Sequence, residues 1–162
     1  MTLPRIALFP MALAGLVVAG ALAVNLVGSS YDVKSERIAE ASQLVTKARE
    51  AYVQEDWPQV RGYAGQAVAL EPTHITARLI LGLAYMNMNA LDQAEAEFRQ
   101  VLTLAKNDLN SAAWAHNNLG VVFQRRGQPG LAAHEYQTAL DLDPSNGQAR
   151  ANLVEVRRYL QQ

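Results

Sequence analysis

The clearest structural pattern in the chain lies in residues 113–146, AWAHNNLGVVFQRRGQPGLAAHEYQTALDLDPSN. Within it, Gly120 and Ala132 stand twelve residues apart, and an aromatic residue, Tyr136, follows four residues later. Small residues at such positions allow two helices to approach closely, and an aromatic ring fills the space that remains. Pro129 falls where the second helix would begin, in a first turn, where proline is tolerated. The pattern therefore predicts two helices packed against each other around a short turn.

The same pattern occurs twice more upstream of this stretch. Gly82 corresponds to Gly120, and Phe98 corresponds to Tyr136. An earlier and weaker copy has alanine, Ala48, where the later copies have glycine. The chain therefore contains three units of equal length, residues 41–74, 75–108 and 113–146, with residues 109–112 inserted before the third.

These units resemble the tetratricopeptide repeat family, in which about 34 residues form two antiparallel helices. The resemblance implies an all-α fold, a right-handed α-solenoid of three helix pairs. The units depart from the family in two ways. Lys106 replaces the proline that usually closes the second unit. The fourth position, usually tryptophan, holds Leu44, Arg78 and His116 in the three units.

The segments on either side of the units are predicted to be helical as well. Residues 147–162 read as an amphipathic helix with Leu153 and Val156 on one face. A repeat array needs such a capping helix with a polar outer side. Upstream, residues 29–40 are predicted to be a short join, in which the first helix starts near Val33.

Two turns carry signals for the start of a second helix. Asp56 follows a polar turn, and an aspartate there can accept a hydrogen bond from a backbone N–H of the first helical turn. Asn89-Ala-Leu-Asp92 resembles a capping box with a shorter acid. We therefore expect side-chain caps at Asp56 and at Asn89.

The N-terminal residues differ from the rest of the chain. Residues 6–28 carry no charge, and 18 of these 23 residues are apolar. About 20 such residues can span a bilayer as a helix, so residues 1–28 are predicted to be a transmembrane anchor. Residues 21–23, Ala-Leu-Ala, also have the form of a signal-peptide cleavage site, so cleavage after Ala23 is the alternative. We expect the remainder of the chain to lie outside the cytoplasm, in the periplasm.

The composition argues against several classes of function. The net charge of −1, from 14 basic and 15 acidic residues, leaves no cationic excess for binding nucleic acid. The chain has no cysteine, and its three histidines share no metal-ligand spacing. Its sequence contains no Ser-His-Asp elbow, HExxH motif or phosphate loop. We therefore predict that the chain is not an enzyme and has no catalytic residue, cofactor or metal.

The resemblance also implies where a partner would bind. In tetratricopeptide repeat proteins, the first helix of each unit lines a concave groove. Carried over position by position, the predicted groove consists of Arg49, Tyr52, Thr76, Leu79, Ile80, Leu83, Met86, Asn87, Trp114, Asn117, Asn118, Val121, Gln124 and Arg125. Some of the apolar members also fit an inter-helix core. The functional interpretation is an apolar groove, edged by amides and an arginine, that suits a hydrophobic helix or an extended segment.

Family members that bind chaperone tails clamp a C-terminal carboxylate with Lys, Asn and Arg at set groove positions. Val45, Ile80 and Trp114 stand at three of these positions here, so the resemblance implies no chaperone-type carboxylate clamp. The sequence thus predicts a non-enzymatic, membrane-anchored adaptor that binds a protein partner in its groove and the lipid bilayer through residues 6–28. Such an adaptor would aid assembly or stability of a membrane or envelope complex. The alternative is an exported soluble module of pilus, secretion or other envelope machinery.

Overall fold

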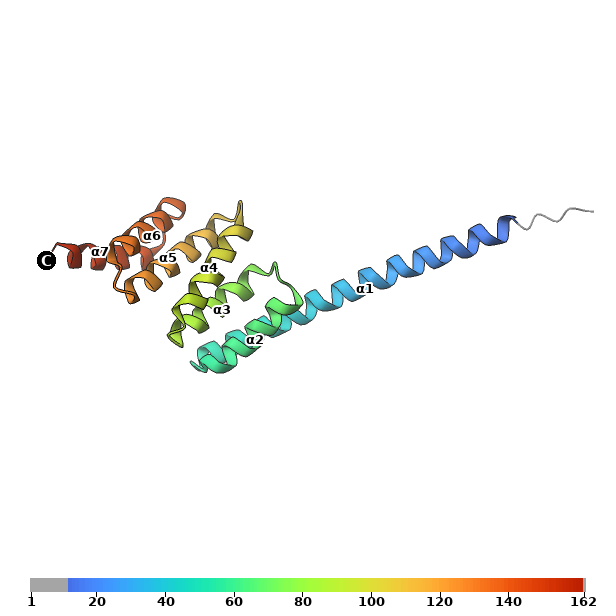
Figure 1. Cartoon of the computed structure of the whole chain (residues 1–162), viewed down its shortest axis with the longest axis horizontal. Helices are drawn as coiled ribbons and strands as arrows, with labels where there is room; N and C mark the ends of the chain where they lie inside the picture. The colour runs from blue at the N-terminus through green and yellow to red at the C-terminus, as the bar shows by residue number, and fades with distance from the viewer. Residues whose placement is uncertain (1–11, 162) are drawn as a thin grey trace, which may run out of the picture. The chain divides into compact units, whose positions relative to one another are not determined.

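The computed structural model describes the backbone of residues 12–161 and the side chains of residues 32–161. Seven α-helices make up the regular structure of this part of the chain, which contains no strand, so the predicted all-α fold is confirmed. The helices are α1 (Ala12–Val53), α2 (Trp57–Leu70), α3 (Ile75–Asn87), α4 (Leu91–Ala105), α5 (Leu109–Arg125), α6 (Pro129–Leu142) and α7 (Gly147–Leu160). From α2 onward, each helix packs against the next one along the chain (Figure 1).

The helices form three pairs, α1–α2, α3–α4 and α5–α6, followed by α7. The four inserted residues 109–112 form the first turn of α5. Asp108 caps this turn, since its carboxylate accepts a hydrogen bond of 3.1 Å from the backbone N–H of Ser111. The hydrogen bonds from the side chain and backbone of Ser111 hold the pKa of Asp108 below its usual value. The insertion therefore lengthens a helix and leaves the pairing of helices unchanged.

Helix α1 continues without a break from Ala12 to Val53, so the helix predicted to start near Val33 begins earlier and includes all of residues 29–40. No proline lies in this range, so no backbone N–H is missing from it. The chain divides into two compact units, residues 1–37 and residues 38–162. No helix among residues 32–161 is long and apolar enough to cross a membrane. The predicted span at residues 6–28 and the cleavage site after Ala23 lie outside these residues, so both stay predictions.

The helix pairs are held together by the small and aromatic residues of the repeat. A Cβ atom built at Gly82 would lie 2.6 Å from Cε1 of Phe98, closer than real Cβ atoms approach a ring. Gly120 faces the ring of Tyr136 in the same way. Both rings are fully buried. The first pair has a buried alanine at each of these positions, Ala48 and Ala64.

The turn inside each helix pair contains one residue with a left-handed backbone conformation. These residues are Glu55 (φ 56°), Asn89 (φ 60°) and Gly127 (φ 70°), at equivalent positions of the three units. The capping box predicted at Asn89 is wrong, because Asn89 forms this turn and α4 starts after Ala90, which makes no side-chain cap. The cap predicted at Asp56 is confirmed: its Oδ1 accepts a hydrogen bond of 3.1 Å from a backbone N–H of α2.

The fourth position of the units, which lacks the family tryptophan, carries a polar pair in the second and third helix pairs. Arg78 of α3 lies 2.8 Å from Glu97 of α4, and His116 of α5 lies 2.7 Å from Glu135 of α6. Both contacts join the two helices of one pair. The equivalent positions of the first pair hold the apolar residues Leu44 and Tyr63. A polar contact therefore takes the place of apolar packing in two of the three units.

Candidate binding groove

A groove runs across the first helix of each pair and across α7. It consists of two adjoining hollows, of about 250 Å³ and about 410 Å³. Their walls share four residues, Tyr52, Leu83, Trp114 and Asn118. Because α3 packs against α5 and α5 packs against α7, side chains of these helices face one common space.

The structure brings twelve of the fourteen predicted groove residues into these walls. Residues three or four apart on a helix face the same side, and the predicted positions on α3 and α5 have this spacing. The twelve are Arg49, Tyr52, Thr76, Leu79, Ile80, Leu83, Met86, Asn87, Trp114, Asn117, Asn118 and Val121. That a partner binds there stays a prediction.

The smaller hollow is mainly apolar and lies between α1, α3 and α5. Leu79, Ile80 and Leu83 of α3 form one wall, and Trp114 of α5 forms another. The Trp114 side chain is 49% exposed, whereas Ile80 is almost fully buried at 7%. Tryptophan is one of the residue types that dominate binding energy at protein interfaces. This hollow can therefore accept a large apolar side chain.

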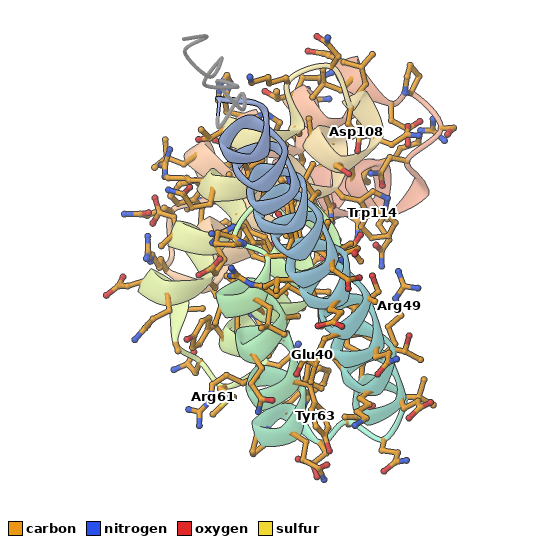
Figure 2. The ribbon with its side chains drawn as sticks, turned by 90° about the vertical axis from the view of Figure 1, so that its right-hand side faces the viewer. Glu40, Arg49, Arg61, Tyr63, Asp108 and Trp114 are labelled. Carbon is orange, nitrogen blue, oxygen red and sulfur yellow. The ribbon has the colours of Figure 1, made fainter. Side chains whose placement is uncertain are left out.

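One cation lies at the edge of the apolar hollow. Among the described residues, Arg49 of α1 is the only charged one in the walls of the groove, and it forms no ion pair with any of residues 32–161. Tyr52, one turn later, packs edge-to-face on Trp57 of α2, with ring centroids 5.3 Å apart and planes at 86°. Figure 2 shows Arg49 and Trp114 toward the same side of the helices, and Arg61 of α2 toward the other. The groove therefore favours an acidic neighbour at the Arg49 end.

Half of the residues that line the larger hollow have amide side chains, and the others are apolar or aromatic. Nδ2 of Asn118 donates a hydrogen bond of 2.8 Å to the carbonyl of Trp114, and Nδ2 of Asn152 donates one of 3.2 Å to Oδ1 of Asn117. Nδ2 of Asn87 donates a bond of 2.9 Å to a backbone carbonyl one turn earlier in α3. These bonds fix the orientation of the amides. They also leave Oδ1 of Asn152 and Asn87 available as acceptors at the groove surface, whereas Asn117 and Asn118 are almost fully buried.

Two residues that line the groove were not among the predicted groove residues, because α7 was predicted only to cap the repeats. Gln148 and Asn152 of α7 line the larger hollow beside Asn117. Counted from Gly147, they stand at the second and sixth positions of a repeat, which are groove positions in the family. Continuing the repeat register into α7 would have identified both.

Two of the predicted residues lie outside the walls of the groove. Gln124 accepts a hydrogen bond of 2.8 Å from the hydroxyl of Tyr136. Burial and the nearby Glu155 carboxylate raise the pKa of Tyr136 well above its usual value. Arg125 donates a hydrogen bond of 2.6 Å from Nη1 to the carbonyl of Met86, and so joins α5 to α3. Both side chains hold the helices together.

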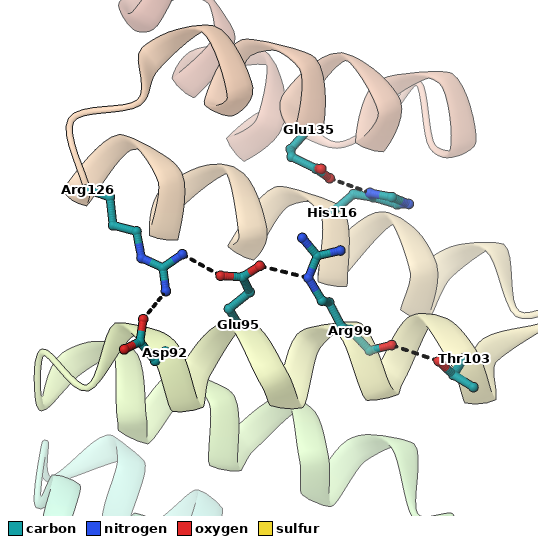
Figure 3. A network of polar contacts seen from close by, with 7 residues as sticks. All are labelled: Asp92, Glu95, Arg99, Thr103, His116, Arg126 and Glu135. Carbon is teal, nitrogen blue, oxygen red and sulfur yellow. Dashed lines mark hydrogen bonds and ion pairs between the residues drawn. The ribbon is translucent and has the colours of Figure 1, made fainter.

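The charged residues between α4 and α5 contact one another and none of them lines the groove (Figure 3). Arg126 at the end of α5 contacts Asp92 and Glu95 of α4, and Glu95 also accepts a bond of 2.8 Å from Arg99. Burial alone would raise the pKa of Glu95, but the hydrogen bonds and charges of the two arginines outweigh burial and lower it. Among residues 32–161, no group of three or more His, Asp or Glu side chains is placed to hold a metal ion. The contacts of Arg126 with Asp92 and Glu95 link the second helix pair to the third.

Comparison with known proteins gives two sequence matches. The family model of the tetratricopeptide repeat matches residues 73–145, which contain the second and third helix pairs. The type IV pilus assembly protein PilF of Pseudomonas aeruginosa is 37% identical to this chain over 87 residues. That match covers 51% of this chain and only 33% of PilF, so the chain corresponds to about a third of the relative's length.

Solved structures share the fold at low sequence identity. The tetratricopeptide domain of Arabidopsis OM64 superposes with a TM-score of 0.70 at 19% identity, covering 76% of this chain and 98% of that domain. The first tetratricopeptide domain of Spaghetti (RPAP3), bound to the HSP90 peptide SRMEEVD, superposes with a TM-score of 0.69 at 18% identity. The match covers 77% of this chain and 96% of that domain. MamA superposes with a TM-score of 0.66 at 18% identity, and the match covers 75% of this chain and 68% of MamA. Helical repeats of this kind therefore extend beyond the region that the family model matches.

Proposed function

Since residues 73–145 of this chain are tetratricopeptide repeats, we propose that the chain is a non-enzymatic adaptor that holds a segment of a partner protein in its groove. Repeats of this family mediate interactions between proteins. The observation that carries the proposal is Trp114, which is half-exposed and lines the smaller hollow beside Leu79 and Leu83, two side chains only partly buried against the core. Exposure of these apolar side chains to water is unfavourable in free energy, and a partner that covers them removes this unfavourable contribution.

The chemistry of the groove differs from that of a chaperone-tail clamp. Val45, Ile80 and Trp114 occupy positions where such a clamp has polar or basic residues, and Val45 and Ile80 are buried. Although the Spaghetti domain is bound to an HSP90 peptide, its likeness to this chain is one of fold alone at 18% identity. We therefore propose an apolar recognition segment in place of a terminal carboxylate.

We propose that residues 6–28 hold the repeats at a membrane, with the repeats on the extracytoplasmic side. The charge-free run in the sequence supports this. Anchoring raises the effective concentration of the groove near membrane-bound partners, so a weak groove interaction can suffice. On this proposal the adaptor aids assembly or stability of a membrane or envelope complex.

The similarity to PilF favours a second candidate function, a role in assembling pilus or related envelope machinery. This function is compatible with an exported module released by cleavage after Ala23. The mass of the mature chain separates the two versions: an intact N-terminus supports the anchor, and a chain that begins after Ala23 supports the exported module. Protease protection in sealed vesicles then reports on which side the repeats lie.

Co-purification from native membranes tests the adaptor proposal. Leu83→Arg places a charge where both hollows meet, and Trp114→Ala removes the exposed ring. Leu131→Arg is the matched control, because Leu131 is 50% exposed on α6 and lines neither hollow. The groove assignment predicts that the first two variants lose a partner that the control retains. A partner set unchanged in all three variants would show that the groove is not the binding site.

A further inference from the structure

The two hollows of the groove differ in chemistry, and the difference restricts the conformation of the partner. The smaller hollow offers apolar side chains and one cation, Arg49. The larger hollow offers the amides of Asn87, Asn117, Asn118 and Asn152. A partner segment that crosses both hollows must therefore present an apolar group to the first and hydrogen-bonding groups to the second.

We infer that the groove takes an extended, internal segment of its partner, with a large apolar side chain in the smaller hollow and an acidic side chain at Arg49. This inference rests on the proposed function and specifies the partner that the groove selects. It disfavours a bound helix, and a chain terminus placed in the larger hollow, for two separate reasons.

The amide hollow is the reason for an extended segment. Backbone N–H groups in the middle of a helix already bond to carbonyls of the same helix, so they cannot bond to asparagines in a groove. An extended chain exposes its N–H and C=O groups along both edges. The Oδ1 atoms of Asn87 and Asn152 are free of the internal bonds that hold their Nδ2 atoms, so they can accept from such N–H groups.

The absence of charge in the amide hollow is the reason for an internal segment. The described residues that form its walls include no Lys, Arg, His, Asp or Glu. A chain terminus carries a full charge, and a charge removed from water without a partner is costly. A segment that continues past both ends of the groove avoids this cost.

Arg49 is the reason for an acidic residue. It lines the same hollow as Leu79 and Trp114 but has no carboxylate partner among residues 32–161. An acidic side chain next to the apolar anchor of the partner would pair with it. Because Arg49 is exposed, the pair contributes more to selectivity than to affinity.

A random peptide library displayed between two folded carrier domains, so that neither peptide end is free, tests the inference on the full chain. The wild-type chain is expected to enrich peptides that have a large apolar residue beside Asp or Glu. Their apolar residues are not expected to recur at the i, i+3 and i+7 positions of a helix. Arg49→Glu is expected to shift the preference at the acidic position to Lys or Arg, by about threefold to fivefold. The matched control is Arg61→Glu, because Arg61 is an exposed residue of α2 that lines neither hollow. This substitution is expected to leave the preference for an acidic residue unchanged.

Methylation of backbone nitrogens in a selected peptide tests the main-chain contacts. We expect binding to weaken about fivefold to tenfold at the positions that face the amides. Three outcomes would overturn the inference: apolar residues enriched at i, i+3 and i+7, a need for a free C-terminus in a second library, or an acidic preference unchanged by Arg49→Glu. If neither library enriches peptides over Leu83→Arg, the proposed function fails as well. Peptides lost in Leu83→Arg but unaffected by methylation would instead leave the proposed function standing.

Discussion

Gly82 faces Phe98 so closely that a Cβ atom at Gly82 would lie 2.6 Å from Cε1 of the ring. The third helix pair repeats this arrangement with Gly120 and Tyr136. In the first pair, where alanine replaces the glycine, the ring is replaced by alanine as well. An aromatic ring at the second position therefore goes with glycine at the first, because a Cβ atom there would clash with the ring.

Replacing Gly82 by alanine forces a methyl group into the ring of Phe98. We expect the free energy of unfolding, measured by urea denaturation, to fall by about 1–3 kcal/mol. Gly65→Ala in α2 is the control, because no atom lies within 4 Å of its built Cβ, and we expect it to gain up to about 1 kcal/mol. In a Phe98→Ala background the cost of Gly82→Ala is expected to disappear. An equal cost in both backgrounds would contradict the steric explanation.

Glu55 is in the left-handed conformation that Gly127 adopts at the equivalent turn of the third pair. This conformation costs a residue with a Cβ atom about 1–2 kcal/mol relative to glycine. We therefore expect Glu55→Gly to raise the free energy of unfolding by about 1 kcal/mol. The neighbouring substitution Gln54→Gly is expected to destabilise, since glycine mainly adds freedom to the unfolded chain. Thermal unfolding distinguishes them, and destabilisation by both would refute the turn assignment.

Arg78 and Glu97 form a contact between α3 and α4 with side chains only 14% and 19% exposed. Removal of one partner leaves a shielded charge, so we expect Arg78→Leu and Glu97→Tyr each to cost about 1–3 kcal/mol. The double variant recreates the Leu44 and Tyr63 combination of the first pair. We expect it to be more stable than the sum of the single variants predicts. Strict additivity in a urea-denaturation cycle would show that the two side chains do not interact.

The pKa of Glu95 predicts a dependence of stability on pH. This pKa is lower in the folded chain than its ordinary value of 4.5, so folding favours the ionised form. The resulting stability is fully present above pH 4.5 and is lost as the pH falls through the folded-state pKa. The gap in unfolding free energy between wild type and Glu95→Gln is therefore expected to narrow from pH 7 to pH 3. A gap that is constant over this range would contradict the role given to Arg126 and Arg99.

Those parts of the structure that follow from local chemistry could be predicted from the sequence. The glycine and aromatic positions of the repeat, the cap at Asp56 and most of the groove walls depend on spacing along single helices. The capping box at Asn89 was mispredicted because the turn needed a left-handed residue there, and several residue types can supply one. The contacts of Arg78 and Gln124 could not be predicted, since their partners lie on other helices and depend on tertiary packing.

Photo-cross-linking in living cells shows whether a partner protein occupies the groove. A photoreactive residue in place of Thr76, which lines the smaller hollow, lies beside any segment held there. The account predicts one dominant cross-linked protein that disappears when Leu83→Arg is added and persists with Leu131→Arg. No cross-linked partner, or one that persists with Leu83→Arg, would contradict the claim that this groove is where the chain binds its partner.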